Sequence, residues 1–109
     1  MKMLIIIVED NDAFAVIDEL NEKGFYVTKL ASTGGFLRSG KTTLICGVNK
    51  DRIPDLVEIV KKKCKVRKQL ASSDLMNLGT TDTHISFPIE ISVGGATIFS
   101  LNVEEFIRV

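Results

Sequence analysis

An unbroken apolar run near the start of the chain, residues 3–8, limits the folds that this sequence can adopt. The run ends at Glu9 and is rich in β-branched residues, which predicts a strand. Side chains alternate between the two faces of a strand, so both faces of this strand are apolar. A strand of this kind belongs in the middle of a sheet that is covered on both sides.

The same run bears on localisation. It is too short to span a membrane, and no signal-peptide cleavage site follows it. The two cysteines, Cys46 and Cys64, fall on an expected strand and on an apolar helix position, and we interpret them as buried free thiols in a reducing compartment. We therefore expect a cytoplasmic protein that has no membrane partner.

Two helices are expected between the strands. Residues 10–12 can cap the first helix, and Gly24 stands where a glycine would end it. Asp51 can cap the second helix, and Pro54 falls in its first turn. Apolar residues recur in this helix at helical spacing, which predicts a stripe that faces the core. The stripe consists of Ile53, Leu56, Val57, Val60 and Cys64.

Further strands are predicted at residues 25–31, 42–48, 89–93 and 96–101. Gly94 and Gly95 predict a two-residue hairpin turn between the last two strands. Asn102 is expected to cap a short helical turn near the C-terminus. Residues 65–87 show weak periodicity, so they predict a long loop that acts as a functional lid or is disordered.

This order is strand, helix, strand, strand, helix, strand, with an added C-terminal strand. It indicates the α+β ferredoxin-like βαββαβ fold in a single domain that covers residues 1–109. In this fold the strands at residues 3–8 and 42–48 are central, and both helices cover one face of the sheet. The other apolar face needs a partner layer, so we expect copies of the chain to form a closed homo-oligomer.

Residues 35–42 match the phosphate-binding P-loop pattern G-x-x-x-x-G-K-[ST] at every position, with Lys41 as its lysine. The mechanism of that motif requires a helix after the loop, because the helix N-terminus faces the phosphates. A short, β-branched and apolar run follows here, which predicts a strand. An ATP-binding protein that uses Lys41 is therefore an alternative, not the leading interpretation.

Other catalytic or metal-binding chemistry is not expected. The one histidine, His84, shows no ligand spacing with the cysteines, and no catalytic triad is legible. Glu9, Asp10 and Asp12 gather where a helix should begin, and compensation of the helix dipole explains them. The 14 basic side chains balance the 14 acidic ones, so no net charge favours a nucleic acid polymer as partner.

The glycine-rich loop is a better candidate for binding than for catalysis. Gly34, Gly35 and Gly40 allow a ligand to approach closely, and Phe36 can stack on a flat ring. Hydroxyl and cationic side chains surround it, a combination that suits a nucleotide with phosphates. The chemistry of these residues alone also allows a hairpin loop without a ligand.

Two long stretches, residues 28–40 and 90–99, together with Thr42, Thr43, Gly47 and Val48, resemble the signature of PII-like cyclic-di-AMP receptor proteins. The similarity extends over the whole chain. It implies a homotrimer of ferredoxin-like subunits with a cyclic di-AMP site in each cleft between neighbours. It also implies a receptor without enzymatic activity or cofactor, which passes the state of the ligand to a partner protein.

The resemblance also implies which residues bind the ligand. Thr28 is expected to bond the phosphates, Gly47 to offer its backbone, and the glycine-rich loop and Phe99 to line an adenine pocket. The expected ligand-binding residues are Thr28, Gly35, Phe36, Leu37, Lys41, Gly47 and Phe99. The stretch at residues 66–87 would correspond to an enlarged loop that is often disordered until ligand binds.

Four positions depart from the usual pattern of this family. Gly24 stands where many relatives have Asn, and Tyr26 where they have Arg; both of those positions normally contact the ligand. Lys41 stands where Asn is common and Arg108 replaces a frequent Gln, so these two cations could restore positive charge at the site. The remaining alternative is a protein-interaction module that binds no nucleotide and uses the long loop.

Overall fold

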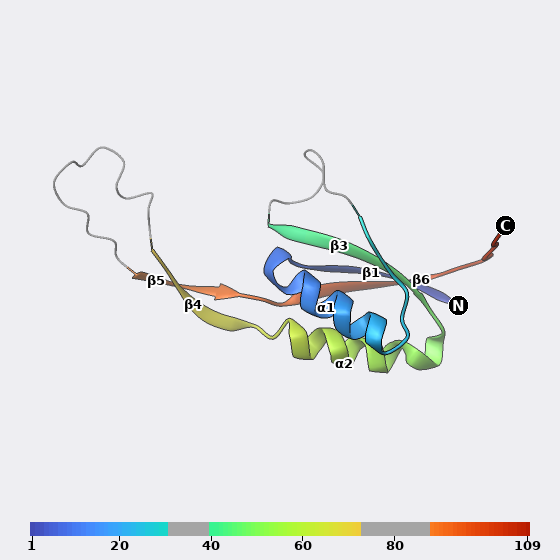
Figure 1. The fold of residues 1–109 in the computed structure, drawn as a ribbon, viewed down its shortest axis with the longest axis horizontal. Helices are drawn as coiled ribbons and strands as arrows, with labels where there is room; N and C mark the ends of the chain where they lie inside the picture. Colours follow the sequence, from blue (N-terminus) through green and yellow to red (C-terminus); the bar gives the residue numbers. More distant parts are fainter. Residues whose placement is uncertain (31–39, 73–87) are drawn as a thin grey trace.

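The computed structural model describes residues 1–30, 40–72 and 88–109 (Figure 1). The elements in chain order are β1 (Lys2–Glu9), α1 (Asp10–Glu22), β2 (Val27–Lys29), β3 (Lys41–Val48), the 3-10 helix η1 (Lys50–Arg52), α2 (Ile53–Lys63), β4 (Arg67–Ser72), β5 (Pro88–Val93) and β6 (Ala96–Asn102).

Four strands form the main sheet in the order β2-β3-β1-β6, and every neighbouring pair is antiparallel. Strands β1 and β3 are therefore central, as expected from the apolar run at residues 3–8. Helices α1 and α2 lie side by side against one face of this sheet (Figure 1). The arrangement is a mixed α+β fold that is compatible with the ferredoxin-like architecture.

The core lies between the helices and the sheet. Leu4, Ile6 and Val8 of β1 are fully buried there, and so is Leu44 of β3. Helix α1 contributes Ala13, Val16 and Leu20 to the core. From the stripe that the apolar spacing predicted, Leu56 and Val60 of α2 are buried, and so is Cys64 directly after it. Side chains alternate between the two faces of β1, so the helices bury only the even-numbered ones. The apolar odd-numbered side chains lie on the other face.

The last third of the chain differs from the prediction. Residues 67–72 were expected in a loop, but they form β4, which pairs with β5 in a second, two-stranded sheet. Strand β6 pairs instead with β1 and occupies the fourth place of the main sheet. The added strands of the fold are thus β4 and β5, and not the last strand. Alternating apolar residues identify strands but not their partners, which explains the error.

Gly94 and Gly95 do not form the expected hairpin turn between β5 and β6. Both have positive φ, 95° and 84°, and they join a strand of one sheet to a strand of the other. A Cβ atom on Gly94 would lie 2.5 Å from the carbonyl oxygen of Lys65. Glycine is therefore required here for a close approach of two backbone segments as well as for φ.

The expected helix caps are partly wrong. Glu9 is the N-cap of α1 and Arg52 that of α2, and neither makes a side-chain capping bond to the described residues. Gly24 ends α1 as expected, with φ of 85° and bonds from the N–H groups of Gly24 and Phe25 to Asn21 and Leu20. Asn102 caps no helical turn, because it belongs to β6 and accepts a hydrogen bond from Lys2.

Strands β4 and β5, called here the ribbon, extend away from the helices and the main sheet (Figure 1). The rest of the predicted loop, residues 73–87, lies outside the described residues, as do residues 31–39. No helix in the described part of the chain is long and apolar enough to cross a membrane.

Candidate functional site

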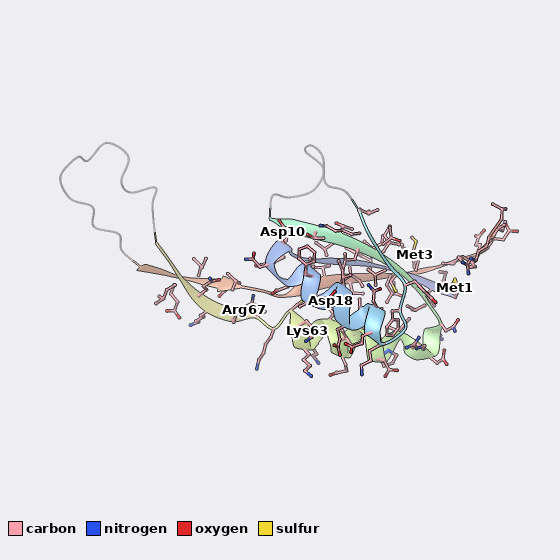
Figure 2. All side chains as sticks on the ribbon, viewed as in Figure 1. Met1, Met3, Asp10, Asp18, Lys63 and Arg67 are labelled. Carbon is pink, nitrogen blue, oxygen red and sulfur yellow. The ribbon has the colours of Figure 1, made fainter. Side chains whose placement is uncertain are left out.

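The main sheet has a second apolar face that neither helix covers, called here the open face. Residues paired across neighbouring strands share a face, so the strand register defines it. Met3, Ile5 and Ile7 of β1 lie on this face, and Figure 2 shows Met3 on the side away from α1 and α2. Phe99 and Leu101 of β6 lie beside them and are 52% and 42% exposed.

The open face gathers four of the seven residues expected to bind ligand. Thr28, Ile45, Ile5 and Phe99 form one row across all four strands. Gly47 lies in the next row beside Met3, and Lys41 lies at the start of β3 on the same side. The other three residues, Gly35, Phe36 and Leu37, fall outside the described residues.

Within this row, Thr28 and Phe99 lie on the two edge strands of the sheet, β2 and β6. Neighbouring strands are separated by about 4.8 Å, so three spacings place the two residues roughly 14 Å apart. That span is large for a single adenine ring to touch both residues at once. In one subunit the two side chains therefore belong to opposite sides of the open face.

The acids at the start of α1 have partners that the sequence did not reveal. Glu9 forms an ion pair with Lys41, with 3.6 Å between carboxylate oxygen and ammonium nitrogen. Asp10 accepts a hydrogen bond of 2.5 Å from the hydroxyl of Thr42, and its N–H donates to the carbonyl of Gly40 at 2.9 Å. Helix-dipole compensation therefore accounts for only part of what these carboxylates do.

The third acid, Asp12, is 5% exposed and accepts two hydrogen bonds from the guanidinium of Arg67, at 2.9 and 3.4 Å. This hydrogen bond raises the pKa of Arg67. Sequence analysis placed Arg67 in the long loop expected at residues 65–87. Only the fold brings it to Asp12, because 55 residues separate the two.

The P-loop pattern does not form a P-loop here. Gly40 has φ of 87°, and Lys41 and Thr42 are the first residues of β3, so a strand follows the loop directly. The ammonium of Lys41 is engaged with Glu9, and the hydroxyl of Thr42 with Asp10. The helix N-terminus that would face phosphates is absent at this point of the described chain.

A cavity of about 530 Å³ lies next to the open face. It brings Gly47 together with two positions that depart from the family pattern, Tyr26 and Arg108. Met1 and Phe106 complete its lining. Sequence analysis expected only a short helical turn after Asn102, and the apolar residues near the C-terminus, such as Phe106, were the signal that could have pointed to this cavity.

The cysteines fit their prediction as buried free thiols. Burial raises the pKa of Cys46, and it raises that of Cys64 to about 11, with the Asp12 carboxylate adding to the effect. Thiols of this kind are poor nucleophiles near neutral pH. Within residues 1–30, 40–72 and 88–109, no three His, Cys, Asp or Glu side chains gather to hold a metal ion, and His84 lies outside these ranges.

Comparison with known proteins identifies the family. A family model described as cyclic-di-AMP receptor matches residues 1–109. The chain belongs to this family. Receptors of this family bind cyclic di-AMP as a ligand, and a binding role in signalling is therefore supported over an enzymatic one.

A solved structure supports the fold. A functionally unknown protein from Pediococcus pentosaceus matches with a TM-score of 0.73 and 36% sequence identity, over 99% of this chain and 96% of that one.

Proposed function

We propose that this protein is a non-enzymatic signalling receptor that binds cyclic di-AMP in clefts between the subunits of a cytoplasmic homotrimer. The match of residues 1–109 to the cyclic-di-AMP receptor family carries the ligand assignment. The geometry of the open face supports the location of the site. Residues 1–109 act as a single domain in this proposal.

The open face supports the assembly of copies of the chain in this proposal, and the number three comes from the family resemblance. Met3, Ile5 and Ile7 are only half-buried in one subunit, and Phe99 and Leu101 are more exposed. Contiguous apolar surface of this kind marks an interaction surface. A sheet of each copy facing the others would supply the missing layer, and the closed symmetry would leave no open face exposed.

The ligand fits the residues in and around this face. Cyclic di-AMP carries two phosphates and two adenine rings. The Thr28 hydroxyl and the Lys41 ammonium would bind phosphate, and Gly47 would offer backbone contact. The glycine-rich loop supplies Gly35, Phe36 and Leu37, and Phe99 forms the opposite wall of the adenine pocket.

The spacing of Thr28 and Phe99 favours a site shared by two subunits. The two residues lie on opposite edges of one sheet. When sheets of neighbouring copies meet edge to edge, Thr28 of one copy can face Phe99 of the next. A single cyclic di-AMP molecule would then contact both copies, which makes trimer assembly part of the site.

Calorimetry against cyclic di-AMP, cyclic di-GMP, ATP and ADP tests the ligand. We expect cyclic di-AMP to bind with one molecule per subunit and the other three to bind at least tenfold more weakly, because none of them presents two adenines and two phosphates in a ring. Tighter binding of ATP, or no binding of any nucleotide at millimolar concentration, would contradict the proposal.

The glycine-rich loop is tested by Phe36→Ala. If an adenine stacks on Phe36, this change should weaken binding by about 1–3 kcal/mol, the range for base stacking on an aromatic side chain. Phe14, which is 72% exposed on α1, offers a matched control. Phe14→Ala should leave the dissociation constant unchanged, and an unchanged constant for Phe36→Ala would remove Phe36 from the site.

A further inference from the structure

The first turn of α1 touches two segments that lie far apart in the sequence. One is the loop base, defined as Gly40, Lys41 and Thr42, where the glycine-rich loop enters β3. The other is the joint of the ribbon, where Arg67 begins β4 and Gly94 follows β5. Figure 2 shows Asp10 at the start of α1 and Arg67 at the root of β4.

On the loop side the contacts involve both faces of β3. The side chain of Glu9 holds Lys41 on the open face, and that of Asp10 holds Thr42 on the face toward the helices. The backbone joins them as well, because the N–H of Asp10 donates to the carbonyl of Gly40. A displacement of the loop base therefore acts directly on Glu9, the last residue of β1, and on Asp10, the first residue of α1.

On the ribbon side one carboxylate carries the side-chain contact to α1. Asp12 is buried and bonds both terminal nitrogens of the Arg67 guanidinium, and one of them also donates to the carbonyl of Lys65 at 3.1 Å. The N–H of Gly95 donates to the carbonyl of Cys64 at 2.5 Å. The hydrogen bonds to the carbonyls of Lys65 and Cys64 lie within the joint. The bonds from Arg67 to Asp12 connect the joint to α1.

The ribbon depends on this joint for its direction. A two-stranded sheet is marginally stable by itself, because it has no face to bury. Leu70 is 70% exposed, and the ion pair between Lys68 and Glu90 lies in solvent, where such pairs contribute little. In the ion pair between Asp12 and Arg67, by contrast, the Asp12 side chain is only 7% exposed, although that of Arg67 is 45% exposed.

We propose that the first turn of α1 couples the loop base to the ribbon, and that the bond between Asp12 and Arg67 is the anchor which the coupling tightens or releases. Asp10 and Asp12 are two residues apart in one helical turn, so they move together. The forked bond to Arg67 depends on orientation, because both nitrogens must face the carboxylate. A small rotation of this turn, caused by a movement of the loop base, thus strengthens or weakens the hydrogen bonds between Asp12 and Arg67.

The role of the ligand in this coupling rests on the proposed function. A phosphate that approaches Lys41 competes with Glu9 for the ammonium, which alters the contacts at the loop base. The ribbon then reports the occupancy of the site at a distance, with one apolar side chain exposed to a partner protein on each face, Leu70 on one and Ile91 on the other. By thermodynamic linkage, a change that frees the ribbon must alter ligand affinity in return.

Hydrogen–deuterium exchange in the ligand-free protein tests the coupling itself. Asp12→Asn should raise the exchange rates of β4 and β5 amides about tenfold, as expected for loss of a charge-assisted hydrogen bond. Arg67→Lys keeps the charge but loses the fork, and it should act in the same direction. If both variants leave ribbon exchange unchanged, the anchor does not exist.

Thr42→Val supplies the decisive variant, because Thr42 lies on β3, outside the ribbon, and the hydrogen bond that its hydroxyl makes among the described residues goes to Asp10. We expect it to raise exchange at the loop base and also, roughly threefold, in β4 and β5. Thr43→Val is the matched control, since Thr43 is equally buried and its hydroxyl has no partner among the described residues. It should leave the ribbon unchanged, and an effect of Thr42→Val confined to the loop base would overturn the coupling.

Addition of cyclic di-AMP to the wild-type protein and to Thr42→Val separates this inference from the proposed function. Binding that changes ribbon exchange in the wild-type protein, and changes it less in Thr42→Val, supports the coupling. Binding without any change in the ribbon overturns its link to the ligand. Failure of cyclic di-AMP to bind overturns the proposed function, while the ligand-free measurements still decide whether α1 joins the two segments.

Discussion

The two faces of the main sheet carry similar amounts of apolar side chain but have different surroundings. Leu4, Ile6 and Leu44 face the helices and are fully buried. Their neighbours Ile5 and Ile45 face the other way and are only half-buried. One face stabilises the fold of a single chain. The other retains apolar surface that is partly exposed in a single chain, and we propose that it serves assembly and ligand binding.

The largest effect that distinguishes the faces is expected from Leu44→Ala and Ile45→Ala, at adjacent positions of β3. Leu44→Ala should lower the free energy of unfolding by about 2–5 kcal/mol, the range for a large side chain removed from a core. Ile45→Ala should lower the free energy of unfolding of the isolated subunit by less, and it should weaken the association of subunits in the proposed trimer. Chemical denaturation and light scattering measure the two effects.

Equal loss of stability in the two variants, with no change in assembly, would show that the faces do not differ. A charged substitution sharpens the comparison, because Ile45→Asp puts a carboxylate into the proposed subunit interface. We expect a folded monomer from it, and a stable trimer would contradict the assigned interface.

A smaller effect is expected from Ile98→Ala and Phe99→Ala in β6. Ile98 packs against the core and Phe99 lies on the open face. Phe99→Ala should weaken cyclic di-AMP binding by about 1–3 kcal/mol if an adenine lies against it. Ile98→Ala should lower stability and leave affinity near that of the wild-type protein. Calorimetry that finds the reverse order would remove Phe99 from the site.

The smallest effect concerns the thiol of Cys64 on the helix side. Its pKa is raised from 9.0 to about 11 in the folded protein, so the folded state keeps its proton longer than the unfolded state does. The stabilisation is complete below pH 9 and is lost as the pH rises through 11. Cys64→Ala should flatten the fall in unfolding free energy over this interval, measured by denaturation at several pH values.

Sequence reasoning succeeded where local patterns decide the structure. The apolar run at residues 3–8 predicted a central strand, and the spacing of Leu56, Val60 and Cys64 predicted the buried stripe of α2. The strand after Gly40 ruled against the P-loop mechanism. Each of these features depends on residues that are close together in the chain.

It failed where distant segments decide the structure. The pairing of β6 with β1, and of β5 with β4, depends on which edge is free in the folded protein. The partners of Asp10 and Asp12 lie 32 and 55 residues away, so the sequence showed only their roles at the start of a helix, capping and compensation of the helix dipole. For the candidate site, Thr28, Gly47, Lys41 and Phe99 share one face, and their binding roles remain predictions.

The central claim is that each cyclic di-AMP site is formed by two subunits, and mixed trimers test it most directly. Thr28→Val and Phe99→Ala each damage one side of every cleft, so each homotrimer should bind weakly. After the two variants are unfolded and refolded together, roughly a quarter of the clefts combine an intact Thr28 with an intact Phe99 from the neighbouring copy. Calorimetry should then recover wild-type affinity in about that fraction of sites, whereas uniformly weak binding in the mixture would contradict a shared site.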